Sequence, residues 1–152
     1  MAQSNHERVG KALELLNKGL QPFIEREMQA VHGERWLQEA AAGLRDYHLA
    51  SARSGELSGD TQALLMILWD QWQAVFRNVL GHAERSLVSE LRETRNKWAH
   101  QEAFSTDDAY RALDSIQRLL TAVSAAGQAS DRRPCTRLFT RLRRRWSAIS
   151  RR

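Results

Sequence analysis

The stretch SLVSELRETRNKWAHQEAFSTDDAYRAL, residues 86–113, decides the fold, because it holds two helical patterns joined by one short loop. On a helix that advances about 100° per residue, Leu87, Val88 and Leu91 share one apolar face. Trp98 falls on the same face and is expected to anchor the helix in the core. The first helix of the stretch is therefore predicted to bury one stripe and to expose the other.

The second helix of this stretch has a clear start signal. Ser105, followed three residues later by Asp108, resembles a capping box in which aspartate takes the place of glutamate. The helix that it opens is predicted over 106–125, and the helix before it over 83–99. A short loop between long helices favours antiparallel neighbours. The seam between the two is expected to contain Leu87, Leu91, Trp98, Leu113, Ile116 and Leu120.

The earlier part of the chain also shows apolar residues at helical spacing, with one proline and no sustained period of two. Asn17 and Gly19 are stop signals, and Pro22 suits the first turn of a new helix. Asp60 is a good N-cap after the loop-like residues 51–60. These signals predict further helices over 5–18, 21–31, 35–49 and 61–80. The predicted fold is an all-α, up-and-down antiparallel bundle of four or five helices, over a domain spanning residues 1–126.

Length and composition fit one globular domain in a reducing compartment. A chain of 152 residues can bury a core, and a hydrophobic share of 42% is that of a folded protein. The single cysteine, Cys135, leaves no internal disulfide and no zinc site built from thiolates. No signal peptide is expected at the N-terminus, and the longest apolar run, 63–68, is too short to span a bilayer. A cytoplasmic location is therefore expected.

The basic charge of the chain belongs to its end. Residues 131–152 contain nine arginines and one aspartate, a net charge of +8, whereas the first 130 residues carry −3. Residues 127–152 are predicted to be a linker followed by a short basic amphipathic helix or an arm that folds on binding. Its candidate ligands are nucleic acid, an anionic membrane or a partner protein. The arginines expected to bind are Arg141, Arg143, Arg144 and Arg145.

Three residues at the polar end of the helix over 83–99 have side chains that could bind a phosphate or transfer a proton. Arg95 can hold a phosphate with paired hydrogen bonds, and His100 can act as a general acid or base. Asn96, one turn before His100, can orient the imidazole. On an ideal helix Arg95 and His100 lie about 140° apart, so they converge only if the helix ends near Ala99 or a second surface completes the site. The alternative is structural, because cationic side chains commonly bond the carbonyls of a last helical turn.

These residues carry a resemblance to a known family. Residues 83–120 resemble the HEPN superfamily (higher eukaryotes and prokaryotes nucleotide-binding), whose hallmark is R-x(4–6)-H, often with a polar residue after the arginine. The nearest subgroup is the one attached to a eukaryotic nuclear mRNA-surveillance endoribonuclease and found in many bacterial proteins. The runs ALELLNKGLQPFIEREM and LLMILWDQWQAVF are similar to it too. The resemblance covers residues 8–124 and leaves the arginine-rich tail outside.

The resemblance implies a function as well as a helical fold. It implies a homodimer with the motif at or beside the interface, and a metal-independent endoribonuclease that needs no cofactor. His100 would activate the ribose 2′-hydroxyl or protonate the leaving 5′-oxygen, Arg95 would stabilise the transition state, and Asn96 would orient the site. The products would be 2′,3′-cyclic phosphate and 5′-hydroxyl ends, and the setting a bacterial toxin or phage-defence system. The alternative is a non-catalytic HEPN module that binds RNA, a nucleotide or a protein within a larger protein or complex.

Weaker candidates surround the motif. Arg92 and Lys97 are cations beside it that could bind RNA, and Tyr110 could stack on a base or simply pack at a helix seam. Asp70, between two tryptophans, would need a partner such as Arg95 or Arg92 if it were buried.

Overall fold

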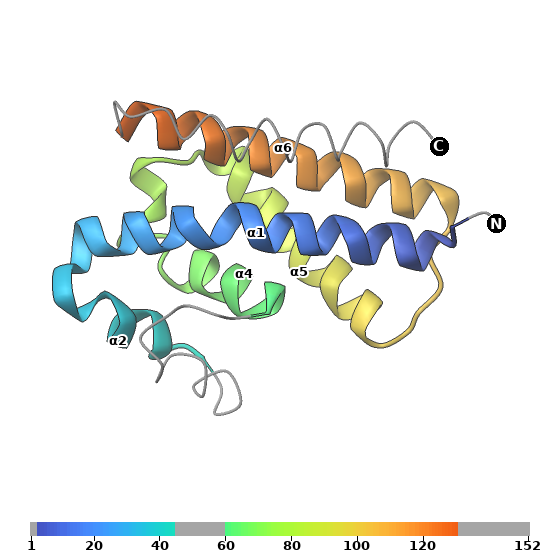
Figure 1. The fold of residues 1–152 in the computed structure, drawn as a ribbon, viewed down its shortest axis with the longest axis horizontal. Helices are drawn as coiled ribbons and strands as arrows, with labels where there is room; N and C mark the ends of the chain where they lie inside the picture. The colour runs from blue at the N-terminus through green and yellow to red at the C-terminus, as the bar shows by residue number, and fades with distance from the viewer. Residues whose placement is uncertain (1–2, 45–59, 131–152) are drawn as a thin grey trace.

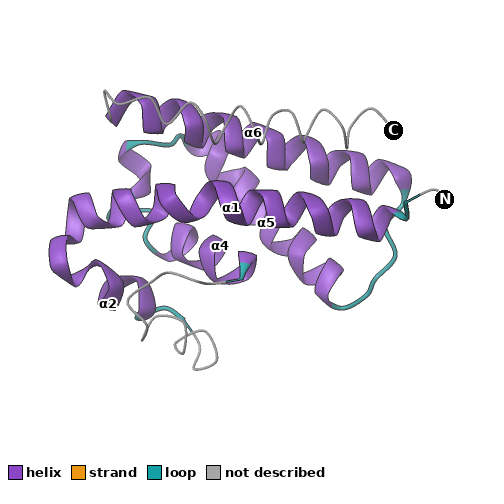
Figure 2. Cartoon of the chain, viewed as in Figure 1, coloured by secondary structure: helices purple, strands orange, loops and turns teal. Residues whose placement is uncertain are grey.

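The computed structural model describes residues 3–44 and 60–130, which form a helical bundle (Figures 1 and 2). No strand occurs within these residues, so the predicted all-α class is confirmed. Short connections complete the bundle: helix α2 (Trp36–Ala41) and two 3-10 turns, Gly33–Arg35 and Phe76–Asn78. Its four main helices are α1 (Asn5–His32), α4 (Thr61–Asp70), α5 (His82–Ala99) and α6 (Thr106–Ser130).

Helix α5 runs antiparallel to both α4 and α6. Contacts between side chains fix these directions, because the end of α5 meets the start of each neighbour. The contacts between α5 and α4 are Arg95–Asp60 and Arg85–Trp69. Those between α5 and α6 are Lys97–Asp108 and Glu90–Arg111. The predicted antiparallel pairing of the two helices in residues 86–113 is therefore correct.

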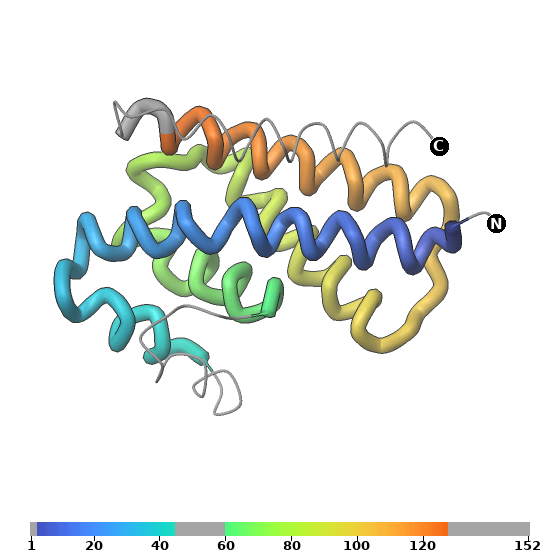
Figure 3. Tube along the Cα trace, in the orientation of Figure 1, coloured from blue at the N-terminus to red at the C-terminus, as the bar shows by residue number. Residues whose placement is uncertain are grey.

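Helix α1 runs beside α6 in the same direction (Figure 3). Asn5 donates to the carbonyl of Phe104 just before α6 begins, and Arg26 lies against Gly127 near the other end. Helix α4 also runs in the same direction as α1, since Thr61 at its start donates to the carbonyl of Leu13 and Gln71 after its end contacts His32. The up-and-down alternation thus holds from α4 to α6, whereas α1 and α4 run the same way because α2 and residues 45–59 lie between them in the chain.

One apolar core fills the bundle. Of the predicted seam between α5 and α6, Leu91 and Ile116 are fully buried and Leu113 is buried. Leu87, Trp98 and Leu120 are half-buried and pack against this core from its edge. The largest fully buried side chains come from α1, α4, α5, α6 and the turn after α4, and include Leu16, Leu20, Ile24, Leu64, Phe76 and Leu119.

Helix α1 is longer than the sequence predicted. The stop at Asn17 and Gly19 is wrong, because one helix runs from Asn5 to His32 with Pro22 inside it. A proline within a helix costs about 3 kcal/mol. Buried apolar residues on both sides of the exposed Pro22, among them Leu20 and Phe23, offset that cost. Gly33, with φ of +60°, ends the helix.

Helix α4 is shorter than the predicted helix over 61–80. Asp60 caps it as expected, with Oδ1 accepting from the N–H of Ala63 at 2.9 Å. After Asp70 the chain leaves the helix, and the side chain of Gln71 contacts the ring of His32 and donates to the carbonyl of Glu39. These bonds to α1 and α2 hold the turn in which Trp72, Val75 and Phe76 are buried.

The remaining differences lie at the ends of elements. Helix α6 continues to Ser130, past the predicted end at 125, because Ala125 and Ala126 favour helix and Gly127 packs against Arg26. Of the helix predicted over 35–49, the structure describes Trp36–Ala41. The predicted loop 51–59 and tail 131–152 lie outside the described residues. Within the described residues, none of the helices has the length and apolarity needed to cross a bilayer.

We expect the substitution Ile116→Ala to lower the free energy of unfolding by about 2–5 kcal/mol, because it leaves a cavity in the core. Tyr110→Ala on the same helix is the matched control, since that side chain is 76% exposed and its loss should change stability by less than about 0.5 kcal/mol. Urea unfolding monitored by circular dichroism measures both. Equal midpoints for the two variants would contradict the described core.

Candidate functional site

The end of α5 is closed by a turn that fixes the backbone of His100. The N–H of His100 donates to the carbonyl of Asn96 at 3.0 Å. Beyond it, the N–H groups of Gln101 and Glu102 donate to the carbonyls of Trp98 and Lys97, each at 3.1 Å. This pair of bonds is a Schellman motif, which requires a left-handed residue at its centre. Gln101 takes that conformation, with φ of 58°, where glycine is usual.

A second contact ties the end of α5 to the start of α1. The indole Nε1 of Trp98 donates to the carbonyl of His6 at 3.2 Å, and the His6 ring stacks on the indole with 5.3 Å between centroids. The Nε2 of His6 lies 3.0 Å from the carbonyl oxygen of Trp98. A carbonyl can only accept, so Nε2 carries the proton. The sequence analysis missed His6, because no local signal links residues 92 positions apart.

The guanidinium of Arg95 is held by two acceptors from the start of α4. Its Nη2 donates to Oδ2 of Asp60 at 3.1 Å, and its Nη1 donates to the side-chain oxygen of Gln62. Asp60 therefore has two roles, because its other carboxylate oxygen caps α4. The Arg95 side chain is only 20% exposed, which makes this pairing more rigid than that of a typical surface ion pair.

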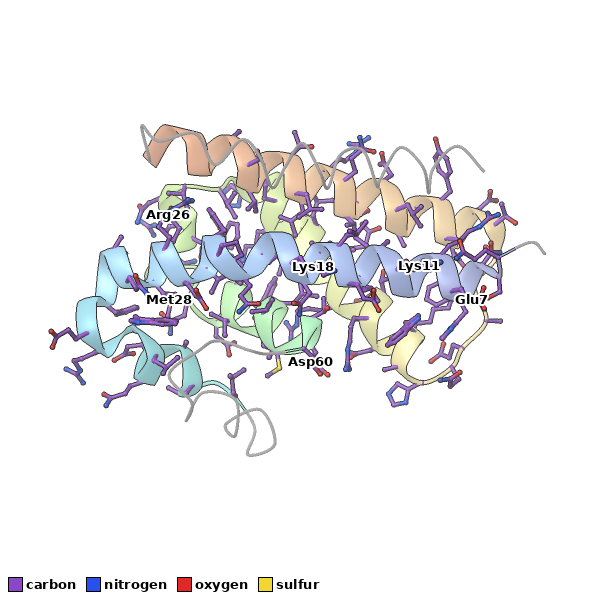
Figure 4. The ribbon with its side chains drawn as sticks, in the orientation of Figure 1. Glu7, Lys11, Lys18, Arg26, Met28 and Asp60 are labelled. Atoms are coloured by element: carbon purple, nitrogen blue, oxygen red, sulfur yellow. The ribbon has the colours of Figure 1, made fainter. Side chains whose placement is uncertain are left out.

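Arg95 also lines a hollow of about 290 Å³ between α1, α5 and the start of α4. Lys18 on α1 and Asp60 at the first turn of α4 mark two of its walls (Figure 4). The hollow combines an aromatic surface with both signs of charge. Glu14 and the indole of Trp98 are among its other lining residues, together with Gly10.

Asn96 and His100 lie on a different side of α5. Both are exposed, and neither lines the hollow that contains Arg95. Helix α5 stays regular to Ala99, so the divergence of about 140° between Arg95 and His100 persists within one chain. The structure thus places Asn96 and His100 together at one accessible edge and Arg95 apart from them.

The weaker candidates differ in how they are engaged. Lys97 pairs with Asp108 at 3.1 Å and lies over the Phe104 ring, so it joins α5 to α6. Arg92 lies over the ring of Trp69, with 5.3 Å to the centroid. Tyr110 is exposed and does not pack at a seam. The tail arginines, Arg141, Arg143, Arg144 and Arg145, lie outside the described residues.

Asp70 does not need the partner suggested by the sequence. It is exposed, and the carboxylate that pairs with Arg95 belongs to Asp60. A metal site is also not formed by the described residues, in which no cluster of three or more His, Cys, Asp or Glu side chains comes together.

The start of α6 carries the clearest electrostatic perturbation. The capping box predicted at Ser105 is present, with its hydroxyl accepting from the N–H of Asp108 at 3.0 Å and the Asp108 carboxylate accepting from the N–H of Ser105 at 3.2 Å. The hydrogen bond from Lys97, followed by those with Ser105, holds the pKa of Asp108 below its ordinary value of 3.8. The ionised form of Asp108 therefore stabilises the junction between α5 and α6.

Comparison with known proteins decides the family. A sequence model of the Swt1-like HEPN family matches residues 11–124, three quarters of the chain. The chain belongs to the Swt1-like HEPN family. The matched region contains α4, α5 and the motif residues Arg95, Asn96 and His100, whereas His6 precedes it. No curated protein and no solved structure matches the chain. The resemblance seen in the sequence is therefore confirmed at the level of the family.

We expect Gln101→Gly to raise the stability of the protein by about 1 kcal/mol, because glycine adopts a positive φ without the steric cost that a side chain brings. Gln101→Ala is the matched control, since alanine also carries Cβ and should give no comparable gain. Thermal unfolding measures the difference. A glycine variant less stable than the alanine variant would contradict the left-handed turn.

We expect Asp108→Asn to be less stable than the unchanged protein at pH 7, and this gap to close in acid. The folded pKa of Asp108 is depressed, so its contribution is present above the unfolded pKa and is lost as the pH falls through the folded pKa. Urea midpoints compared between pH 7 and pH values below 3.8 test this. The neighbouring Asp107→Asn serves as control, and a gap that stayed constant with pH would exclude the ion pair as its cause.

Proposed function

We propose that this HEPN protein is an endoribonuclease whose site is built from Arg95, Asn96 and His100. The observation that supports this best is the motif itself, which lies within the family-matched region at the end of α5. His100 is exposed, and hydrogen bonds of the Schellman turn hold the backbone around it, so its ring is accessible at a defined position. As part of this proposal, the enzyme acts in a bacterial toxin or phage-defence setting.

The proposed reaction is an intramolecular transesterification, in which the 2′-oxygen attacks the adjacent phosphorus. His100 takes the proton of a ribose 2′-hydroxyl, and the 2′-oxygen forms a bond to the adjacent phosphorus while the bond from phosphorus to the 5′-oxygen breaks. The leaving 5′-oxygen takes a proton from solvent water and the His100 imidazolium releases its proton to solvent, which gives a 2′,3′-cyclic phosphate and a 5′-hydroxyl. Arg95 donates to the non-bridging oxygens as their charge grows, and Asn96 orients the imidazole or the phosphate. The proposal requires no metal ion.

Arg95 keeps donors for a phosphate even while it is paired. A guanidinium has five N–H groups, and Asp60 and Gln62 accept from only two of them. The pairing also restricts the rotation of the long side chain, so less conformational entropy is lost when a phosphate binds. Asp60 and Gln62 thus support Arg95 as positioning residues in this proposal.

A second chain would complete the site. Within one chain Arg95 faces the hollow and His100 faces away from it, so the two cannot reach the same phosphate from opposite sides of α5 without another surface. In a two-fold dimer that pairs the ends of α5, His100 of one protomer could face Arg95 of the other. A homodimer through the motif-bearing helices is therefore part of the proposal.

One observation favours a second candidate function. Arg95 is paired and half-buried, and it lies apart from His100, as expected if it holds α4 against α5. In that case the chain is a non-catalytic HEPN module that binds RNA, a nucleotide or a protein partner. The two functions differ in one measurable property, the cleavage of RNA.

We expect His100→Ala to lower RNA cleavage by about 10²–10⁴-fold, because the general base is lost. Arg95→Ala should lower it by about 10²–10³-fold, because a donor to the transition state is lost, and the double variant should lose much less than the product of both. His82→Ala, another exposed histidine on α5, is the matched control and should retain activity. The 2′,3′-cyclic ends are detected by mass spectrometry, in the presence and absence of EDTA.

Mixing the two inactive variants tests the composite site. Purified Arg95→Ala and His100→Ala chains, exchanged at equal concentration, form heterodimers in which one of two sites has both residues. Roughly a quarter of the original activity should then return. No recovery, although subunit exchange is verified, would place both residues of each site in one chain. Absence of cleavage of every RNA tested by the unchanged protein would overturn the catalytic proposal in favour of the binding module.

A further inference from the structure

Two arginines on α5 differ in what holds them from four other arginines of the bundle. Arg26, Arg95, Arg111 and Arg118 each pair with a carboxylate. Arg85 and Arg92 instead both lie over the ring of Trp69, at 4.8 and 5.3 Å from its centroid, and no described carboxylate lies within ion-pair distance of either.

This arrangement fixes two positive charges without neutralising them. Arg85 also contacts the ring of Trp72 at 6.0 Å, and its Nε is buried with no hydrogen-bond partner in the described part of the chain. A cation–π contact holds a guanidinium by its face, so the terminal Nη–H groups at its edge can still donate to an anion. Trp69, on α4, therefore presents both guanidiniums in a set position.

The two arginines share one stripe with the motif. Arg85, Ser89, Arg92, Asn96 and His100 follow each other at spacings of four, three, four and four residues. On a helix they fall within about 80° of one another. With about 1.5 Å of rise per residue, Arg92 lies about 12 Å and Arg85 about 22 Å along the axis from His100. The stripe contains no apolar side chain, and Glu93 is the exposed carboxylate beside it.

We propose that this stripe is a phosphate track for single-stranded RNA, leading from Trp69 to His100. The inference rests on the ribonuclease proposal for the place of the cleaved bond. With stacked bases about 3.4 Å apart along a strand, Arg92 would meet a phosphate roughly three nucleotides from the cleaved bond and Arg85 one roughly six nucleotides away. A membrane surface fits the stripe less well, because it has no apolar residue to insert.

Binding of a non-cleavable RNA tests the track without requiring activity. The probe is a fluorescent 12-nucleotide strand of mixed sequence with 2′-O-methyl groups, and anisotropy gives Kd of the 152-residue chain over a range of salt concentrations. Each of Arg85→Gln and Arg92→Gln should reduce the slope of log Kd against log salt by about 0.7, the value for one lost phosphate contact on a single strand. Arg118→Gln is an equal charge change on α6 and should leave the slope unchanged. Because every variant keeps the same tail, the contribution of the tail to the slope cancels in the comparison.

A second pair of variants keeps the test valid if removing either arginine disturbs folding. Ser89→Glu adds a negative charge in the middle of the stripe without removing either arginine, and should weaken binding at low salt about threefold. Thr121→Glu, at an exposed position on α6, should have no such effect. Circular dichroism confirms the fold of each variant.

The outcomes separate this inference from the ribonuclease proposal. Unchanged slopes for both glutamine variants, together with equal binding by Ser89→Glu and Thr121→Glu, would overturn the track even if cleavage is observed. Reduced slopes without any cleavage would support the track and assign the protein to RNA binding. If cleavage is observed, a strand with a single ribonucleotide fixes the position of the cleaved bond, and the distance from that bond to each arginine can then be tested. Shortening its flank on one side to four nucleotides should then abolish the effect of Arg85→Gln but not that of Arg92→Gln.

Discussion

The indole of Trp98 is the contact on which the end of α5 depends. It binds the carbonyl of His6, stacks on the His6 ring and approaches α1 so closely that a Cβ on Gly10 would lie 2.9 Å from Nε1. Glycine is required there because any side chain would displace the indole. Since Asn96 and His100 are two residues from Trp98 on either side, pinning this one side chain fixes the place of both. A half-buried tryptophan thus joins the packing of α1 against α5 to the position of the polar motif.

The second constraint is electrostatic and acts through Asp60. One carboxylate oxygen caps α4 and the other accepts from Arg95, so the start of α4 and the motif arginine are positioned by the same group. Loss of a cap typically costs about 1 kcal/mol, whereas loss of the Arg95 contact would leave a half-buried guanidinium with fewer acceptors. The fold and the proposed chemistry therefore share Asp60. A change at this residue would affect stability and function together, and only comparison with Gln62, which touches Arg95 but does not cap α4, separates the two effects.

Local signals in the sequence predicted the elements well, and contacts between distant residues account for what they missed. The caps at Asp60 and Ser105 and the seam through Leu91 and Ile116 follow from spacing alone, because each signal lies within one or two turns. The continuation of α1 through Pro22 depends on packing against α4 and α6, and the break after Asp70 on bonds from Gln71 to residues far away in the chain. The same holds at the site. The motif was found in the sequence, but its supports, His6 and Asp60, are neighbours only in the folded chain.

The charge of the described bundle explains why position matters more than net charge for binding RNA. The first 130 residues carry a net charge of −3, yet salt at physiological strength screens charges beyond about 8 Å. A phosphate near Arg92 is therefore influenced mainly by its immediate neighbours, which are Arg85, whose guanidinium lies over the same Trp69 ring, and Glu93 at the edge of the stripe. Trp69 replaces the carboxylates that neutralise the other paired arginines, so the local potential along α5 stays positive on an acidic body. The tail, with its net charge of +8, would raise the concentration of RNA near the protein, while the stripe would determine where on the bundle the strand lies.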